Sequence, residues 1–329
     1  MTYATSTGRR SAAPTNGGAG APAVPIAVLT AALPLLREVG DLKRVRVAGA
    51  AGSMAERAFA RAWSHVVRGD SLRRVADREC AAALAGARLS GLDAAAMRRC
   101  GLSAAQTLAV LRRSAAEHPK SPTGATSTRL TSALGDVVDE AFRTRVATAP
   151  VPAFVSALCD QPRAGATCPG RPRLIVEPPE SHGDHCWAVA VYGGLLADAF
   201  GADPADVFLL GLGHHLHNAV LPDAGFAGET LLGGELKPLL ARLTKAQSAI
   251  LPRELESRLE ELWTLREHAD TPVARAFHAA DVLDRVLQVH HHARAAAFVA
   301  AQALEDLELV HASPVSAFQD AVLAVVEAA

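Results

Sequence analysis

Three histidines fall within four positions of the stretch LLGLGHHLHN, residues 209–218. They are His214, His215 and His217, and they follow directly on an apolar run. Imidazoles bind transition metals and exchange protons near neutral pH. At the end of an apolar helix they need partners, because burying an unpaired polar group is unfavourable. The stretch therefore predicts a metal site or a proton-transfer site, completed by residues from elsewhere in the chain.

Two other stretches carry residues of the right type. His185 begins the helical stretch HCWAVAVYGGLLA, and Asp281 lies among Ala, Val and Leu in FHAADVLDRVLQ. A histidine, a histidine pair and a distant aspartate together form a metal-ligand set, which suits Zn, Fe, Mn, Co or Ni. Taken singly, each residue also has an ordinary interpretation: a helix start, a C-terminal helix cap, or an ion pair of Asp281 with Arg285.

The three stretches resemble the HD-domain superfamily of metal-dependent phosphohydrolases, over roughly residues 178–304. Members of that superfamily carry a histidine, a His-Asp pair and a final aspartate on a bundle of helices. HCWAVAVYGGLLADAFGAD is similar to the helix of the first histidine, DVFLLGLGHH to the helix of the pair, and FHAADVLDRVLQ to the closing helix. The resemblance implies one divalent transition metal held by His185, His214, His215 and Asp281.

Position 215 departs from that pattern, because the family has aspartate there and this chain has His215. A neutral imidazole still ligates a metal, but it adds no negative charge and does not bridge two metals. The site is less anionic by one charge, so we expect it to favour Zn, Fe, Co or Ni over Mg. The same substitution weakens the expectation of ordinary phosphohydrolase activity.

Further candidates surround the pair. His217, Asp223 and Glu229 are predicted to move protons, as acid or base, near the metal. An equally open interpretation makes the segment after the pair a solvated loop, with Asp223 as a turn residue. Five side chains are candidate substrate contacts, with a surface role as the alternative; they are His182, Asn218, Lys237, His278 and Arg285.

Three functions remain open at this point. The first is a metal-dependent hydrolase that acts on a phosphoester or nucleotide-like small molecule through a metal-bound water. The second is a catalytically degenerate HD-like module that senses a signal or binds a partner. The third is an iron-dependent oxygenase of HD type. The phosphorylated substrate rests on the family resemblance alone.

The elements that would position these residues are helical. Ala and Leu dominate the apolar content, aromatic residues make up only 4% of the chain, and strand signals are nearly absent. We therefore predict an all-α fold, with an HD-type helical bundle in the C-terminal half preceded by a helical N-terminal region. We expect four divisions: a disordered tail at 1–24, a helical region at 25–150, a Pro/Gly-rich connection at 151–184 and the metal-binding domain at 185–329. The connection contains a short extended piece, RLIVE, and helices resume at His185.

Charge and cysteine usage limit the partners. Residues 1–150 hold 21 Lys and Arg against 11 Asp and Glu, whereas the whole chain holds 33 against 34. The simplest consequence is attraction between a basic first half and an acidic second half. Few aromatics accompany the basic residues, which disfavours nucleic acid as a partner. The five cysteines form no CxxC pair and no run is long enough to cross a membrane, so we expect a cytoplasmic protein with a small-molecule substrate, and a homo-oligomer remains open.

Overall fold

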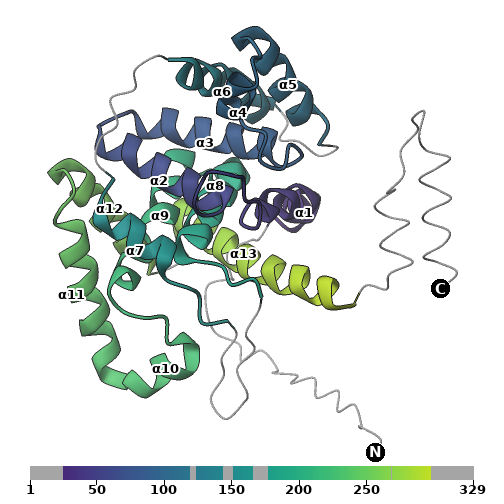
Figure 1. Ribbon diagram of the computed structural model, residues 1–329. Coiled ribbons are helices and arrows are strands. Elements are labelled where there is room, and N and C mark those ends of the chain that lie inside the picture. The colour runs from purple at the N-terminus through teal and green to yellow at the C-terminus, as the bar shows by residue number, and fades with distance from the viewer. Residues whose placement is uncertain (1–24, 119–123, 144–150, 166–176, 268, 298–329) are drawn as a thin grey trace, which may run out of the picture.

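The computed structural model describes residues 25–118, 124–143, 151–165, 177–267 and 269–297 (Figure 1). The predicted tail at 1–24, nearly all of the predicted extended piece RLIVE, and residues 298–329 of the predicted C-terminal domain lie outside them. The α-helices are α1 (Ile26–Asp41), α2 (Met54–Val67), α3 (Leu72–Gly86), α4 (Ala94–Arg99), α5 (Ala104–Ala116), α6 (Gly124–Phe142), α7 (Ala153–Asp160), α8 (His182–Phe200), α9 (Pro204–Gly213), α10 (Gly225–Leu232), α11 (Leu236–Ser248), α12 (Arg253–Arg266) and α13 (Pro272–Ala297). Two short 3₁₀ turns, η1 (Leu216–Ala219) and η2 (Gly233–Glu235), complete the elements.

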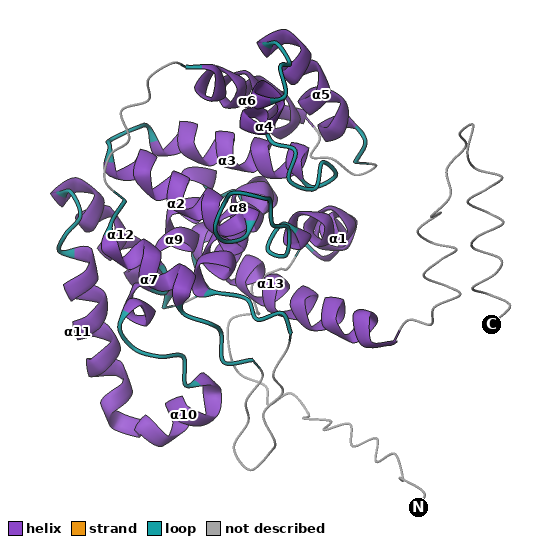
Figure 2. Cartoon of the chain, in the orientation of Figure 1, coloured by secondary structure: helices purple, strands orange, loops and turns teal. Residues whose placement is uncertain are grey.

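The all-α prediction is confirmed. Within the described ranges every regular element is a helix, as Figure 2 shows, and the only strand-like feature is an isolated bridge between Pro162 and Ser181. None of the described helices is long and apolar enough to cross a membrane.

Local sequence signals explain where the central helices begin and end. Helix α8 starts at His182, three residues earlier than expected, because Ser181 and Asp184 form a capping box. In a capping box the two side chains satisfy each other's backbone N–H groups at the helix start. Helix α9 starts with the Asp203 cap followed by Pro204, a combination that favours helix initiation. The early start of α8 places His182 one turn before His185, on the same face of the helix.

Helix α8 is the centre of the fold. Fifteen of its 19 residues are buried, so it is apolar on nearly every side. It packs against α9 and α13 of the C-terminal half and against α1, α2 and α3 of the N-terminal half. Its contact with α9 is unusually close, because a Cβ on Gly211 would lie only 2.5 Å from the Cα of Ala190. The buried apolar residues of both halves form one continuous core.

Buried ion pairs join the two halves, as the uneven charge predicts. The ammonium of Lys43, which follows α1, lies 2.8 Å from Glu180 and 2.6 Å from Asp284. Arg44 Nη2 lies 2.5 Å from the other oxygen of Glu180. Lys43, Glu180 and Asp284 are all almost completely buried. A basic segment of the first half is therefore fixed on acidic residues beside the predicted site.

Candidate metal site

The predicted histidines meet where three helices converge. His185 lies in the first turn of α8, and His214 and His215 follow the last residue of α9. The metal-ligating atoms of His185, His214 and His215 all lie within 4.8 Å of one another. His185 and His214 are buried and His215 is half-buried. Three of the four predicted ligands thus form one compact group.

Each imidazole of this group is oriented by a hydrogen bond at its Nδ1. His185 Nδ1 lies 2.8 Å from Asp284 Oδ2, and His214 Nδ1 lies 2.7 Å from the carbonyl oxygen of Gly211. His215 Nδ1 lies 2.8 Å from Asn218 Oδ1, whose amide nitrogen donates to the carbonyl of Leu221. All three partners are oxygen acceptors, so each Nδ1 carries the proton and donates it. The lone pair of each ring is therefore on Nε2.

These lone pairs face one another. Nε2 of His185 and Nε2 of His214 lie 3.2 Å apart. Two lone pairs at this separation repel each other unless a proton or a cation lies between them. Burial and the neighbouring imidazoles hold the pKa of His214 and of His215 well below the ordinary value, so both rings stay neutral and able to ligate. Nδ1 bonds to a carboxylate or a carbonyl are also the usual support of metal-binding histidines. The donor set fits a divalent transition metal.

Asp281 lies at the edge of this group, on α13. Its Oδ1 is 3.3 Å from His185 Nε2. Burial would raise the pKa of its carboxyl, but the contact with the His185 ring and the positive charge of Arg285 hold it well below its usual range. Asp281 is therefore an ionised carboxylate beside Nε2 of His185.

Asp284 and Lys43 are the residues that sequence reasoning missed. Asp284 has no exposed side-chain surface, and it binds both Lys43 Nζ and His185 Nδ1. Burial disfavours its ionisation, yet the charge of Lys43 and the hydrogen bond from His185 keep its pKa well below the ordinary value. The spacing from Asp281 to Asp284 was a usable signal, because residues three apart share a helix face. Lys43 gave no comparable signal, since it lies 241 residues away from Asp284.

His182 and Asp223 form a second pair next to the histidine group. The ring of His182 lies 4.8 Å from that of His215, and its Nε2 lies 3.4 Å from Asp223 Oδ2. Burial lowers the pKa of His182 to about 4. Asp223 also accepts hydrogen bonds from the backbone N–H groups of Ala164 and Gly225, so it fixes two loops as well.

The remaining histidines have different neighbours. The ring of His217 lies 5.4 Å from that of His215, and burial lowers its pKa to about 4. His278 donates from Nε2 to the carbonyl of Arg266, 2.8 Å away. Arg266 in turn donates to the carbonyl of His214, at 3.0 Å. His278 therefore reaches His214 only indirectly, through Arg266.

Three other predicted site residues are exposed. Glu229 lies on α10, Lys237 on α11 and Arg285 on α13. Figure 1 shows α10 and α11 along the outer side of the molecule, where α11 packs against η1, the turn that carries His217. Asn218, in contrast, is buried and holds His215 in place.

Comparison with known protein families supports the resemblance that the sequence motifs suggest. Residues 156–311 match the family described as the HD domain. The same comparisons match the chain to no curated protein and to no solved structure. The matched segment contains all four predicted ligands and the helices that carry them. Residues 156–311 of this chain are therefore an HD domain, with a histidine triad as its candidate metal site.

Proposed function

We propose that the protein is a metal-dependent hydrolase of a phosphoester or nucleotide-like small molecule, with one divalent transition metal. The observation that carries the proposal is that ring nitrogens of three histidines lie within 4.8 Å of one another, while each ring is oriented by an Nδ1 hydrogen bond. Asp281, beside His185 Nε2, is the fourth proposed ligand. Three imidazole ligands and a single carboxylate favour Zn, Fe, Mn, Co or Ni over Mg.

A bound divalent metal supplies Lewis acidity and lowers the pKa of a water molecule in its coordination sphere. His182 is well placed to accept a proton next to such a site. The carboxylate of Asp223 faces its Nε2 at 3.4 Å, which favours the tautomer with the proton on Nε2. The lone pair then lies on Nδ1, which has no hydrogen-bond partner among the described residues. His217, whose ring lies close to His215, is a second candidate for the same step.

Arg163 is the proposed partner of a substrate phosphate. Its backbone N–H donates to the carbonyl oxygen of Glu180, 2.9 Å away and two residues before His182, and after burial its positive charge is a further cause that lowers the pKa of His182 and His215. Its Nη1 is buried and has no hydrogen-bond partner within the described part of the chain. A guanidinium with free N–H groups suits phosphate oxygens, which accept paired hydrogen bonds.

Metal analysis of the full chain tests this proposal. We expect about one equivalent of a transition metal per chain after dialysis, and loss of most of it in His214→Ala, because a site with a missing ligand binds far more weakly. His278→Ala is the matched control, since that histidine is half-buried nearby but hydrogen-bonds a carbonyl. Hydrolysis of bis-p-nitrophenyl phosphate should appear with the metal-loaded protein and vanish in His214→Ala.

Three results would contradict the proposal, each in its own way. Equal metal content in His214→Ala and in the parent chain would place the metal elsewhere. A metal-loaded chain that hydrolyses no phosphoester, and gains hydrolysis only in His215→Asp, would show a degenerate module. Iron near two equivalents per chain, with oxygen consumption, would show an oxygenase.

A further inference from the structure

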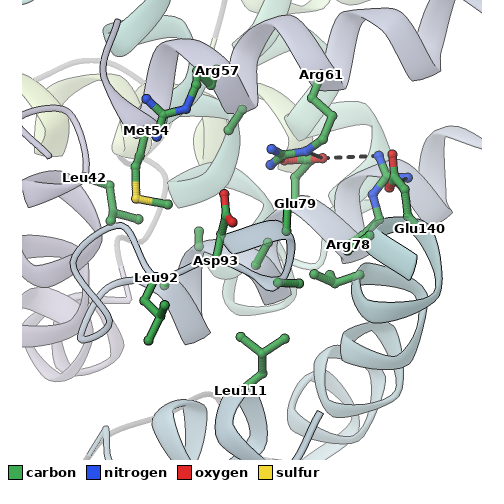
Figure 3. Close-up of a pocket in the computed structure, with 18 of the residues that line it drawn as sticks. Leu42, Met54, Arg57, Arg61, Arg78, Glu79, Leu92, Asp93, Leu111 and Glu140 are labelled. Atoms are coloured by element: carbon green, nitrogen blue, oxygen red, sulfur yellow. Dashed lines mark hydrogen bonds and ion pairs between the residues drawn. The ribbon is translucent and has the colours of Figure 1, made fainter. Parts of the chain in front are cut away.

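A cavity of about 330 Å³ lies in the N-terminal half, outside the histidine site. Figure 3 shows its lining, with Arg61 on one side and Leu111 facing it from the other. The apolar part of the wall comes from α2 to α6 and their flanking loops and includes Leu42, Met54, Leu92, Leu111 and Val137. Its volume is at the lower end of the range for small-molecule sites. The floor includes Trp187 of α8, two residues after His185.

The charged side chains of this wall balance one another. Arg61 makes two hydrogen bonds to Glu79, at 3.0 and 2.6 Å, and Arg78 lies 2.8 Å from Glu140. The wall also holds one further arginine, Arg57, and one further carboxylate, Asp93. Three arginines thus face three carboxylates around the cavity. A ligand that carried a net charge would leave this balance uncompensated in a largely apolar space.

The hydrogen-bonding groups of the wall are not balanced. Trp187 is 2% exposed, and its Nε1 has no hydrogen-bond partner in the described part of the chain. Arg57 Nη2 and Arg78 Nε are likewise buried without a partner there. All three atoms are N–H donors, which can only give a hydrogen bond. Among the described lining residues the buried, unpaired side-chain groups are therefore donors alone.

From this imbalance we propose that the cavity binds a neutral, largely apolar small molecule that carries a carbonyl-type oxygen. The apolar body of the ligand fills the space between the leucine and alanine side chains. Its oxygen accepts hydrogen bonds from Trp187 Nε1 and from Arg57 Nη2, two buried donors that the protein leaves unpaired and that a small shift of the neighbouring side chains opens to the ligand. Asp93 is committed in part to the backbone, because its Oδ1 caps the N–H of Ala96. The cavity shares helix α8 with the histidine triad, through Trp187.

Two probes of one shape test the ligand class. Benzophenone carries a carbonyl between two phenyl rings, and diphenylmethane carries a methylene in its place. We expect benzophenone to bind the full chain with one equivalent in isothermal titration calorimetry. It should bind about tenfold more tightly than diphenylmethane, because only the ketone satisfies a buried donor.

Three variants locate the binding. Ala82→Leu places three more carbon atoms in the cavity wall, so both probes should bind at least about tenfold more weakly. Ala105→Leu makes the same change on the exposed side of α5 and should leave both affinities unchanged. Arg57→Lys keeps the positive charge of the wall but takes away the Nη2 donor, so it should weaken benzophenone alone, by about fivefold. Circular dichroism checks that each variant is folded.

Each opposite result overturns part or all of the proposal. If neither probe binds, or if Ala82→Leu binds both as the parent chain does, the cavity is not a ligand site. If diphenylmethane binds as tightly as benzophenone, the unpaired donors do not select the ligand. The assay uses no metal and no phosphoester, so its result is independent of the proposed hydrolase activity.

Discussion

The histidine site and the N-terminal cavity treat their hydrogen-bonding groups in opposite ways. At the histidine site each Nδ1 has an oxygen partner, and the atoms left over are Nε2 lone pairs beside the Asp281 carboxylate. In the cavity the carboxylates have partners, and the atoms left over are N–H donors. Buried polar groups are almost always paired, so what remains unpaired indicates the ligand. These leftover atoms are the basis of the two proposals, a cation at the first site and an oxygen acceptor at the second.

Helix α8 separates the two sites. His185 and Trp187 are two residues apart, and successive residues of an α-helix are rotated by about 100°. The two side chains therefore leave the helix on nearly opposite sides, one toward the histidines and one toward the cavity. Such an arrangement needs a helix that is buried all round, which accounts for the small and aliphatic residues of α8.

The largest effect that tests the contrast between the two sites is the effect of an Asp284 substitution on metal affinity. Asp284→Asn replaces the carboxylate that fixes the His185 tautomer by an amide, which can present its NH₂ group to Nδ1 instead. The affinity for Zn²⁺ should fall about 10- to 100-fold, the usual cost of losing such an outer partner. Competition with a fluorescent zinc chelator measures it. Benzophenone binding should not change.

Asp206→Asn is the matched control, because it removes a carboxylate from α9 that pairs with Arg258, at 2.6 Å, rather than with a histidine. It should leave the zinc affinity unchanged. An unchanged affinity in Asp284→Asn would mean that His185 is oriented by packing alone. A similar loss in both variants would mean that the effect is general destabilisation.

The second effect is on acid stability of the metal-free protein. Burial lowers the pKa of His182 and of His217 from 6.5 to about 4. Between these values the unfolded chain binds protons that the folded chain does not, so stability falls as the pH falls from 6.5 toward 4. Each group contributes at most about 1.4 kcal/mol per pH unit to this slope.

Urea unfolding at a series of pH values measures that slope. His182→Gln and His217→Gln should each reduce the slope by up to about 1.4 kcal/mol per pH unit, which corresponds to one proton. The double variant should reduce it by about the sum. The same series at pH 7 to 8 should show no difference in slope, because both histidines are neutral there in the folded and the unfolded chain. A parent slope that persists in the double variant would show that these rings take up protons without unfolding.

The sequence was informative about those site residues that lie in, or directly after, a single recognisable helix. The helical fold is confirmed, and the clustering of His185 with the pair at 214–215 agrees with the prediction, because apolar periodicity and residue type are local properties. Asp281 as a metal ligand stays a prediction. The contacts of Lys43 with Glu180 and Asp284 were beyond such reasoning, since they join segments far apart in the chain. The hydrogen bond from His215 to Asn218 became visible only in the structure, because the 3₁₀ turn after α9 brings the amide oxygen of Asn218 back to His215.

The cavity was not predictable at all. Its donors belong to ordinary helix residues, and the sequence does not indicate which of them lack a partner once the helices pack. Alanine is frequent throughout α2 and α3, so the alanines that face empty space look the same as those in close contact. Only the packed structure separates Ala82, which lines the cavity, from Ala81, which is fully buried in the core.

The smallest effect is on the stability of the free protein. Ala82→Leu adds apolar volume to a cavity, so it should raise the free energy of unfolding by about 0.5 to 1 kcal/mol. Ala105→Leu, on the exposed side of α5, should change it by about zero, since it buries almost nothing. Urea unfolding measures both. A loss of about 1 kcal/mol or more in Ala82→Leu would indicate an over-packed wall. At the histidine site an added apolar group should not raise the free energy of unfolding in this way, because it would lie against polar ring nitrogens and leave them without a partner.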